Sequence, residues 1–191
     1  MKNTKRLEVL FSVASLYDLG ETLEVLHAEL RSPGEPEKKL DEMHQLPEYM
    51  QARERLIRTS SIFWERLVPR HTTRDIYAFV LKLGCKIKIL ASGWGFTPKE
   101  PGYNWLGQFP NSDILQTQTP REVSGDVLVD IKVPRIAEWN ISNPNGLVII
   151  PKDPENKYYS FQGVKGYVRY NGTNSKEYKK AIMDKIRPDK K

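Results

Sequence analysis

The sequence is poor in the residues that build covalent frameworks and metal-bound sites. It has one cysteine, Cys85, so an internal disulfide and a multi-cysteine zinc site are excluded. Its three histidines, His27, His44 and His71, show no HExxH spacing, and no glycine-rich phosphate loop follows a strand-like run. No apolar run is long enough to cross a membrane. We therefore expect an intracellular, cytoplasmic protein without a membrane span, and no motif identifies a reaction.

The net positive charge of the chain lies in its second part. Residues 1–84 hold 13 Lys and Arg against 13 Asp and Glu, whereas residues 85–191 hold 17 against 11. The second part also holds three of the four tryptophans and six of the nine tyrosines. This division predicts a helical scaffold half in residues 1–84. It predicts a basic, aromatic, β-rich half in residues 85–191 that meets an acidic partner, and the two halves are also compatible with one continuous domain.

The period of the apolar residues changes at Gly84. Before it, helical spacing predicts helices in residues 7–17, 47–68 and 72–83, the last beginning with a Thr72–Asp75 capping box and ending at Gly84. After Gly84, alternation predicts strands, followed by a final amphipathic helix near the end of the chain. The expected fold class is α+β: a helical amino-terminal half packed on a mainly antiparallel carboxy-terminal sheet, with that helix closing the chain. The expected strands cover residues 85–89, 113–119, 126–133, 147–150 and 158–170.

Aromatic and basic side chains alternate near the end of the chain, a pattern typical of surfaces that bind nucleic acid. If residues 158–170 form one strand, side chains two apart share a face, where rings stack on bases and cations contact phosphates. Lysines on the final helix extend the basic region. The favoured function is therefore binding of RNA or single-stranded DNA without catalysis and without a cofactor. The predicted contact residues are Tyr159, Phe161, Lys165, Tyr167, Arg169, Lys176, Lys179 and Lys180.

An alternative interpretation starts from the acidic residues of the expected strand at 126–133. Asp130 and Lys132 lie two residues apart and would share a face, with Asp113 on the preceding strand. Together with the order of elements over residues 72–151, this pattern resembles the PD-(D/E)xK nuclease superfamily. The resemblance implies that Asp113 and Asp130 hold Mg²⁺ and that Lys132 positions or activates the attacking water.

A third interpretation concerns the segment of glycine, proline and aromatic residues that follows the expected strand at 85–89. It includes the stretch from Trp94 to Trp105 and is long for a loop without secondary structure. Exposed aromatic side chains there would form an interface for a protein partner in a module without catalytic function. The sequence leaves enzyme and binding protein open, with nucleic-acid binding favoured over the nuclease and the interaction module.

Overall fold

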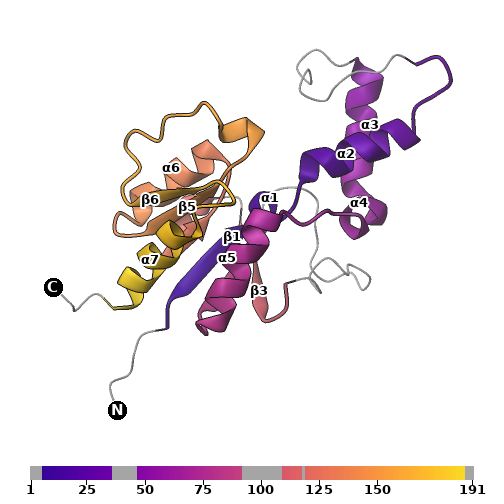
Figure 1. The fold of residues 1–191 in the computed structure, drawn as a ribbon. Helices are drawn as coiled ribbons and strands as arrows, with labels where there is room; N and C mark the ends of the chain where they lie inside the picture. The colour runs from indigo at the N-terminus through magenta and orange to yellow at the C-terminus, as the bar shows by residue number, and fades with distance from the viewer. Residues whose placement is uncertain (1–5, 36–46, 92–108, 118, 188–191) are drawn as a thin grey trace. The chain divides into compact units, whose positions relative to one another are not determined.

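The computed structural model describes residues 6–35, 47–91, 109–117 and 119–187 (Figure 1). The chain forms two compact units. Unit 1 comprises residues Met1–Leu16, Pro69–Gly93 and Asn111–Lys191, and unit 2 comprises Tyr17–Val68 and Trp94–Pro110. Each unit is therefore built from segments that are distant in sequence. The functional division at residue 84 stays a prediction, and the expected Trp94–Trp105 interface lies outside the described residues.

Unit 1 is built on a six-stranded sheet in which every neighbouring pair is parallel. The spatial order is β3-β2-β1-β4-β5-β6. The expected antiparallel sheet is therefore wrong. Strands of one direction need crossover connections, and helices supply several of them here. The strands are β1 (Glu8–Ser12), β2 (Lys86–Ala91), β3 (Ser112–Gln116), β4 (Val127–Val129), β5 (Leu147–Pro151) and β6 (Tyr167–Tyr170).

The first described element is a strand, and the helix predicted for residues 7–17 is wrong. Strand β1 pairs with β2 on one side and β4 on the other, and α1 (Val13–Leu16) adds one helical turn after it. Val9, Leu10 and Phe11 are all fully buried. A central parallel strand is covered on both faces, so its apolar residues run continuously instead of alternating. Such a short run matches helical spacing equally well.

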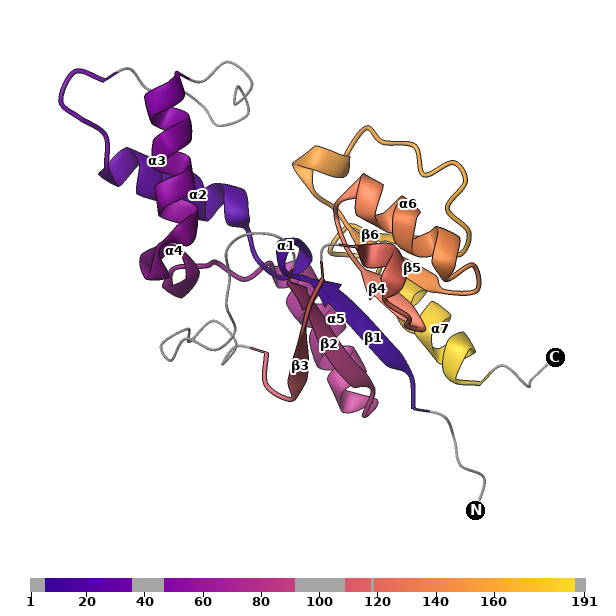
Figure 2. The same ribbon diagram turned by 180° about the vertical axis from the view of Figure 1, so that it is seen from behind.

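Helices cover both faces of this sheet. Helices α5 (His71–Lys82) and α7 (Ser175–Ile186) lie on one face, and α6 (Val133–Ser142) lies on the other (Figures 1 and 2). The Phe11 ring packs against Tyr77 of α5, whereas Leu10 belongs to a core cluster with Trp139 of α6. Successive residues of β1 therefore supply the cores of opposite faces. The expected final amphipathic helix is present as α7, with Tyr178 and Ile182 fully buried.

The boundaries of α5 agree with the prediction at one end only. Gly84 follows the helix with a φ of 70°, the left-handed conformation that glycine adopts without strain. The amino end differs, because the helix begins at His71 and its N-cap residue, Arg70, makes no side-chain capping bond. The predicted Thr72–Asp75 capping box is therefore wrong, and Asp75 bonds to the Tyr170 hydroxyl.

Unit 2 contains α2 (Leu19–Glu29), α3 (Glu48–Thr59) and α4 (Ser61–Glu65). The single helix expected over residues 47–68 is divided at Ser60, which is extended and accepts a hydrogen bond from the Phe63 amide. Helix α2 begins where the Asp18 carboxylate accepts from the Glu21 amide. Across the described segments of both units, we find no helix with the length and apolar character of a membrane span.

Candidate functional site

The carboxyl ends of β1 and β4 form the topological switch point of the sheet. These strands are neighbours, but the chain leaves them toward opposite faces of the sheet. After β4 it enters α6 on one face, and after β1 it returns to β2 through α5 on the other face. In open parallel sheets of this kind, ligands bind outside the carboxyl ends of the strands at the switch point. This rule makes Ser12, at the end of β1, and Asp130, directly after β4, the natural starting points for a site.

Hydroxyl groups order the chain at the end of β1. The Ser12 hydroxyl accepts a hydrogen bond from the Ser15 amide at 3.1 Å. The Ser15 hydroxyl contacts the carbonyls of Ser12 and Val129 at 2.8 and 2.9 Å, which links β1 to β4. Thr73 of α5 donates to the Ser15 carbonyl at 2.5 Å. Because Ser12, Ser15 and Thr73 are fully buried, this network fixes the backbone beside the switch point.

The carboxylate of Asp130 occupies the same edge at the end of β4. One oxygen, Oδ1, accepts from the amides of Ile131 and Lys132 at 2.7 and 3.1 Å, which turns the chain into α6. The other, Oδ2, lies 3.3 Å from Nε of Arg135 but has no hydrogen-bond partner. Asp130 is only 1% exposed. Its charge therefore balances that of Arg135, and its Oδ1 is used by its own turn.

A hollow of about 290 Å³ opens beside this turn; we call it the β4 hollow, and its lining residues are Ile131, Lys132, Val133, Pro134 and Tyr159. Lys132 and Tyr159 had been predicted for two different sites, and the fold brings them to one. The Tyr159 side chain is 57% exposed. The β4 hollow thus combines one cation, one accessible ring and an apolar wall.

The nuclease arrangement of Asp113, Asp130 and Lys132 is wrong. Asp113 lies near the amino end of β3, opposite Lys88 of β2, whereas Asp130 follows the carboxyl end of β4. Strands β2 and β1 separate β3 from β4, a lateral distance of about 14 Å at about 4.8 Å per strand. The two carboxylates therefore cannot share one Mg²⁺. Lys132 is the N-cap residue of α6 and not a strand residue, so the parity argument also fails.

The predicted nucleic-acid-binding face is not assembled as expected. Strand β6 covers only Tyr167–Tyr170, so the preceding predicted residues lie in a connection and share no strand face. Phe161 is 5% exposed and belongs to the core cluster on the α6 face. Asn140 holds the backbone of Lys165 with two hydrogen bonds. Asn140 Nδ2 donates to the Lys165 carbonyl, and the Lys165 amide donates to Asn140 Oδ1.

The lysines predicted on the final helix have separate roles. Lys180 forms an ion pair with Asp184 at 2.7 Å. The ammonium group of Lys179 lies over the rings of Phe79 and Tyr178. Lys176 is exposed in the first turn of α7. Lys179 and Lys180 therefore each have a contact partner on α5 or α7.

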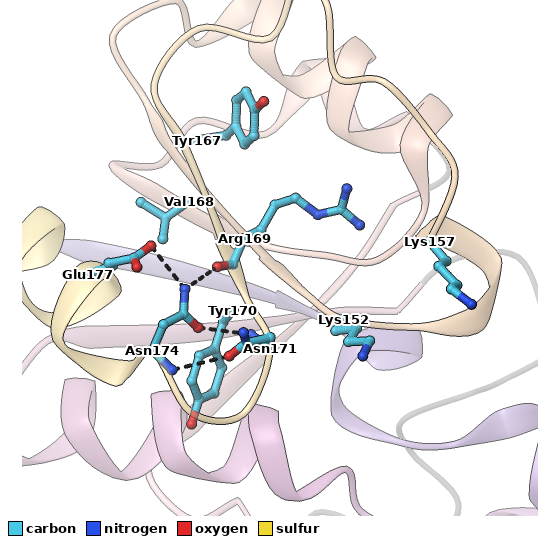
Figure 3. Close-up of a pocket in the computed structure, with 9 residues that line it drawn as sticks. All are labelled: Lys152, Lys157, Tyr167, Val168, Arg169, Tyr170, Asn171, Asn174 and Glu177. Carbon is cyan, nitrogen blue, oxygen red and sulfur yellow. Dashed lines mark hydrogen bonds between the residues drawn. The ribbon is translucent and has the colours of Figure 1, made fainter.

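Tyr167 and Arg169 both line a second hollow, which runs along strand β6 and past the end of β5 (Figure 3). This hollow has a volume of about 560 Å³, and we call it the β6 hollow. Its cations come from three separate positions in the fold: the end of β5, the turn after it, and β6. The lining residues are Lys152, Lys157, Tyr167, Val168, Arg169, Tyr170, Asn171, Asn174 and Glu177.

Sequence reasoning missed the residues at the end of β1. Helical spacing predicts a helix over residues 7–17, and a helix does not place Ser12 and Ser15 at the end of a strand. A signal was present, since Ser12 and Asp130 each come directly after a short buried apolar run. The ion pair of Arg70 with Asp153 at 2.6 Å joins residues far apart in sequence and has no comparable signal.

Comparison with known proteins supports the observed architecture. No family model and no curated protein sequence matches this chain. Among solved structures, a putative β-phosphoglucomutase from Thermotoga maritima is similar with a TM-score of 0.54 and 14% identity, over 85% of this chain and 94% of that one. A haloacid dehalogenase-like family hydrolase from Xanthomonas campestris has a TM-score of 0.47 and 10% identity, over 95% and 97% of the two chains.

The similarity to the Thermotoga structure concerns the fold. At 14% identity it establishes the fold alone and not the function. With the parallel sheet, it overturns the expected α+β architecture. The expectations of RNA or single-stranded DNA binding and of a PD-(D/E)xK nuclease are corrected with it, whereas the interface expected at Trp94–Trp105 lies outside the described residues. The described residues predicted for these two functions come from separate strands, connections and helices of unit 1.

Proposed function

We propose that this chain binds a phosphorylated small molecule at the carboxyl edge of its sheet, in the β4 hollow beside the switch point. The observation that carries the proposal is the position of Lys132, which lines a hollow directly after β4, where sheets of this topology bind ligands. The similar Thermotoga protein is named for a phosphorylated sugar.

The lining of the β4 hollow suits such a ligand. Lys132 offers an ammonium group to a phosphate, and the exposed ring of Tyr159 offers a flat surface to a sugar or ring. The Asp130 carboxylate does not oppose an anion there, because its Oδ1 accepts from two amides and its Oδ2 faces Arg135. The acidic side chain of this turn is therefore already engaged, and Lys132 is the cation that lines the hollow.

The proposal concerns binding because the hydroxyl groups beside the switch point are used within the protein. The Ser15 hydroxyl contacts two carbonyls, and the Ser12 hydroxyl accepts from the Ser15 amide. A serine nucleophile needs an adjacent base within hydrogen-bond reach, and the described partners of both serines are backbone groups. These serines support the shape of the site, and the ligand contacts come from Lys132 and Tyr159.

Calorimetric titration of the full chain with glucose 1-phosphate, glucose 6-phosphate and unphosphorylated glucose tests the proposal. We expect saturable binding of a phosphorylated sugar, no binding of glucose, and at least about tenfold weaker binding by Lys132→Gln. Lys165→Gln removes the same charge outside the hollow and should bind like the unmodified chain. If no phosphorylated sugar binds, or if Lys132→Gln binds as tightly as the unmodified chain, the proposal fails.

A further inference from the structure

The β6 hollow gathers positive charge with little opposing charge. Three of its lining residues, Lys152, Lys157 and Arg169, are cations, and Glu177 is its one acidic lining residue. Lys152 follows β5, Lys157 follows a short 3₁₀ turn, η4 (Pro154–Asn156), and Arg169 belongs to β6. In Figure 3 the Arg169 guanidinium extends toward the side where the two lysines lie. Like charges that converge around one concavity create a positive potential that favours an anion.

The one acidic residue lies on the opposite wall and is already engaged. Glu177 Oε2 accepts a hydrogen bond from Asn174 Nδ2 at 2.9 Å. The same amide nitrogen donates to the Arg169 carbonyl at 2.8 Å, which joins the start of α7 to β6. Figure 3 shows Glu177 beside Asn174 and away from Lys152 and Lys157. Within the described residues, neither lysine has a carboxylate within ion-pair distance.

Arg169 is held in position before any ligand arrives. Its Nη2 donates to the Asn156 carbonyl at 2.9 Å, and its guanidinium lies over the Phe161 ring at 5.3 Å from the centroid. Both contacts restrain the planar group. The described hydrogen bonds use Nη2 alone, so N–H donors at Nε and Nη1 remain for a ligand. A restrained guanidinium loses less rotamer entropy when it binds an oxyanion, and its fork geometry matches phosphate.

We propose that the β6 hollow binds a compact oxyanion of the phosphate class, held by Arg169, Lys152 and Lys157. The hollow has the volume of a small-molecule site, about 560 Å³. The half-exposed Tyr167 ring on its wall could contact a group attached to the phosphate. This site goes beyond the proposed function, because the β6 and β4 hollows share no lining residue.

Titration calorimetry of the full chain with inorganic phosphate, at constant ionic strength maintained with chloride, tests the site. We expect saturable binding and at least about tenfold weaker affinity in the double variant Lys152→Gln/Lys157→Gln. Both lysines are exposed, so this variant should fold normally. Arg169→Gln should weaken binding in the same direction. Phenyl phosphate forms a second arm: tighter binding than phosphate identifies a phosphate ester as the ligand, and equal affinity identifies the free ion.

Two controls separate this site from general charge and from the β4 hollow. Lys165→Gln/Lys176→Gln removes two charges outside the β6 hollow, and Lys132→Gln alters the β4 hollow. Both should bind phosphate as the unmodified chain does. The proposal is overturned if phosphate does not bind saturably, or if either control weakens binding as much as the Lys152/Lys157 double variant does. Failure of sugar phosphate binding at Lys132, with phosphate still bound here, would reject only the proposed function.

Discussion

The Tyr170 hydroxyl donates a hydrogen bond to Oδ2 of Asp75 at 3.0 Å, which ties the end of edge strand β6 to helix α5. Tyr170 is 1% exposed, and its ring packs edge-on against Tyr178 of α7. Burial, followed by the bond to Asp75, raises the pKa of the Tyr170 hydroxyl. One phenol therefore connects three elements of unit 1.

Removal of this hydroxyl should lower the stability of unit 1. Tyr170→Phe keeps the ring but loses the bond to Asp75, and we expect the free energy of unfolding to fall by about 1–2 kcal/mol. The loss of free energy is measured by urea unfolding of Tyr170→Phe, Asp75→Ala and the double variant. The double variant should lose less than the sum of the single losses. Strict additivity would contradict the coupling.

The two aspartates once assigned to a common metal site should behave differently. Asp130→Ala leaves Arg135 without its buried counter-charge and frees two amides, so the free energy of unfolding should fall by about 2–4 kcal/mol. Asp113 is exposed near the amino end of β3, and Asp113→Ala should change stability by less than about 0.5 kcal/mol. Chemical denaturation of both variants provides the comparison. Equal losses would contradict the placement of Asp130.

Gly146 leaves room for the Trp139 indole, because a Cβ atom at this position would collide with the ring. We expect Gly146→Ala to lower the free energy of unfolding by about 1–3 kcal/mol through overpacking. Gly20→Ala is the matched control, since its added carbon would lie 3.6 Å from the nearest atom, Asp18 Oδ1. That variant should be neutral or more stable, because alanine favours helix. Thermal unfolding of both variants measures the difference. A Gly146→Ala variant as stable as the unmodified chain would contradict the prediction.

Acid should destabilise unit 2 through His27. Burial, and then the nearby Arg53 charge, lower the pKa of His27 from 6.5, against the opposite influence of Glu54 and Glu35. Both ring nitrogens lack hydrogen-bond partners. The folded state therefore favours neutral His27, and its contribution to stability, complete above pH 6.5, is lost as pH falls through the lowered pKa.

The His27→Leu variant should lose less stability than the unmodified chain between neutral pH and about pH 5. The exposed His71 supplies a control, because His71→Leu should leave the pH dependence unchanged. Free energies of unfolding measured across this range decide the matter. Identical pH profiles for His27→Leu and the unmodified chain would show that His27 does not carry the effect.

Alkaline pH should destabilise unit 1 through Tyr178. Burial, and then the neighbouring Tyr170 and Asp75, raise the pKa of the Tyr178 hydroxyl from 10.0 to about 12. Its contribution to stability is complete below pH 10.0 and is lost as pH rises through about 12. Tyr178→Phe should therefore lose less stability over this range, whereas Tyr158→Phe, at a side chain that is 87% exposed, should not differ from the unmodified chain. Unfolding measured at both ends of the range tests this.

Local patterns predicted some elements of the fold correctly. Alternation after Gly84 indicated a strand that the structure has as β2, and Tyr178 and Ile182 marked the buried side of α7. Glycine at residue 84 indicated the end of α5, because few residues other than glycine adopt its φ of 70°. These features depend on neighbours in sequence, so one sequence is enough to find them.

The chain order also hid part of the site. Lys132 and Tyr159 meet because β4 ends beside the connection that follows β5, and no local period relates residues so far apart. Ser12 was missed because the buried run of β1 matches helical spacing as well as strand spacing. Only pairing with β2 and β4 distinguishes the two.

The sequence by itself determined that α5 ends before Gly84 and which side of α7 is buried, and it placed the net positive charge in residues 85–191. The tertiary structure alone decided the direction and order of the strands, which placed Asp113 near the amino end of β3 and Asp130 after the carboxyl end of β4, with two strands between them. It also gathered Lys152, Lys157 and Arg169 around one hollow. Strand order depends on long-range pairing between buried backbones, whereas helix ends and charge content are set by residues close together in the chain.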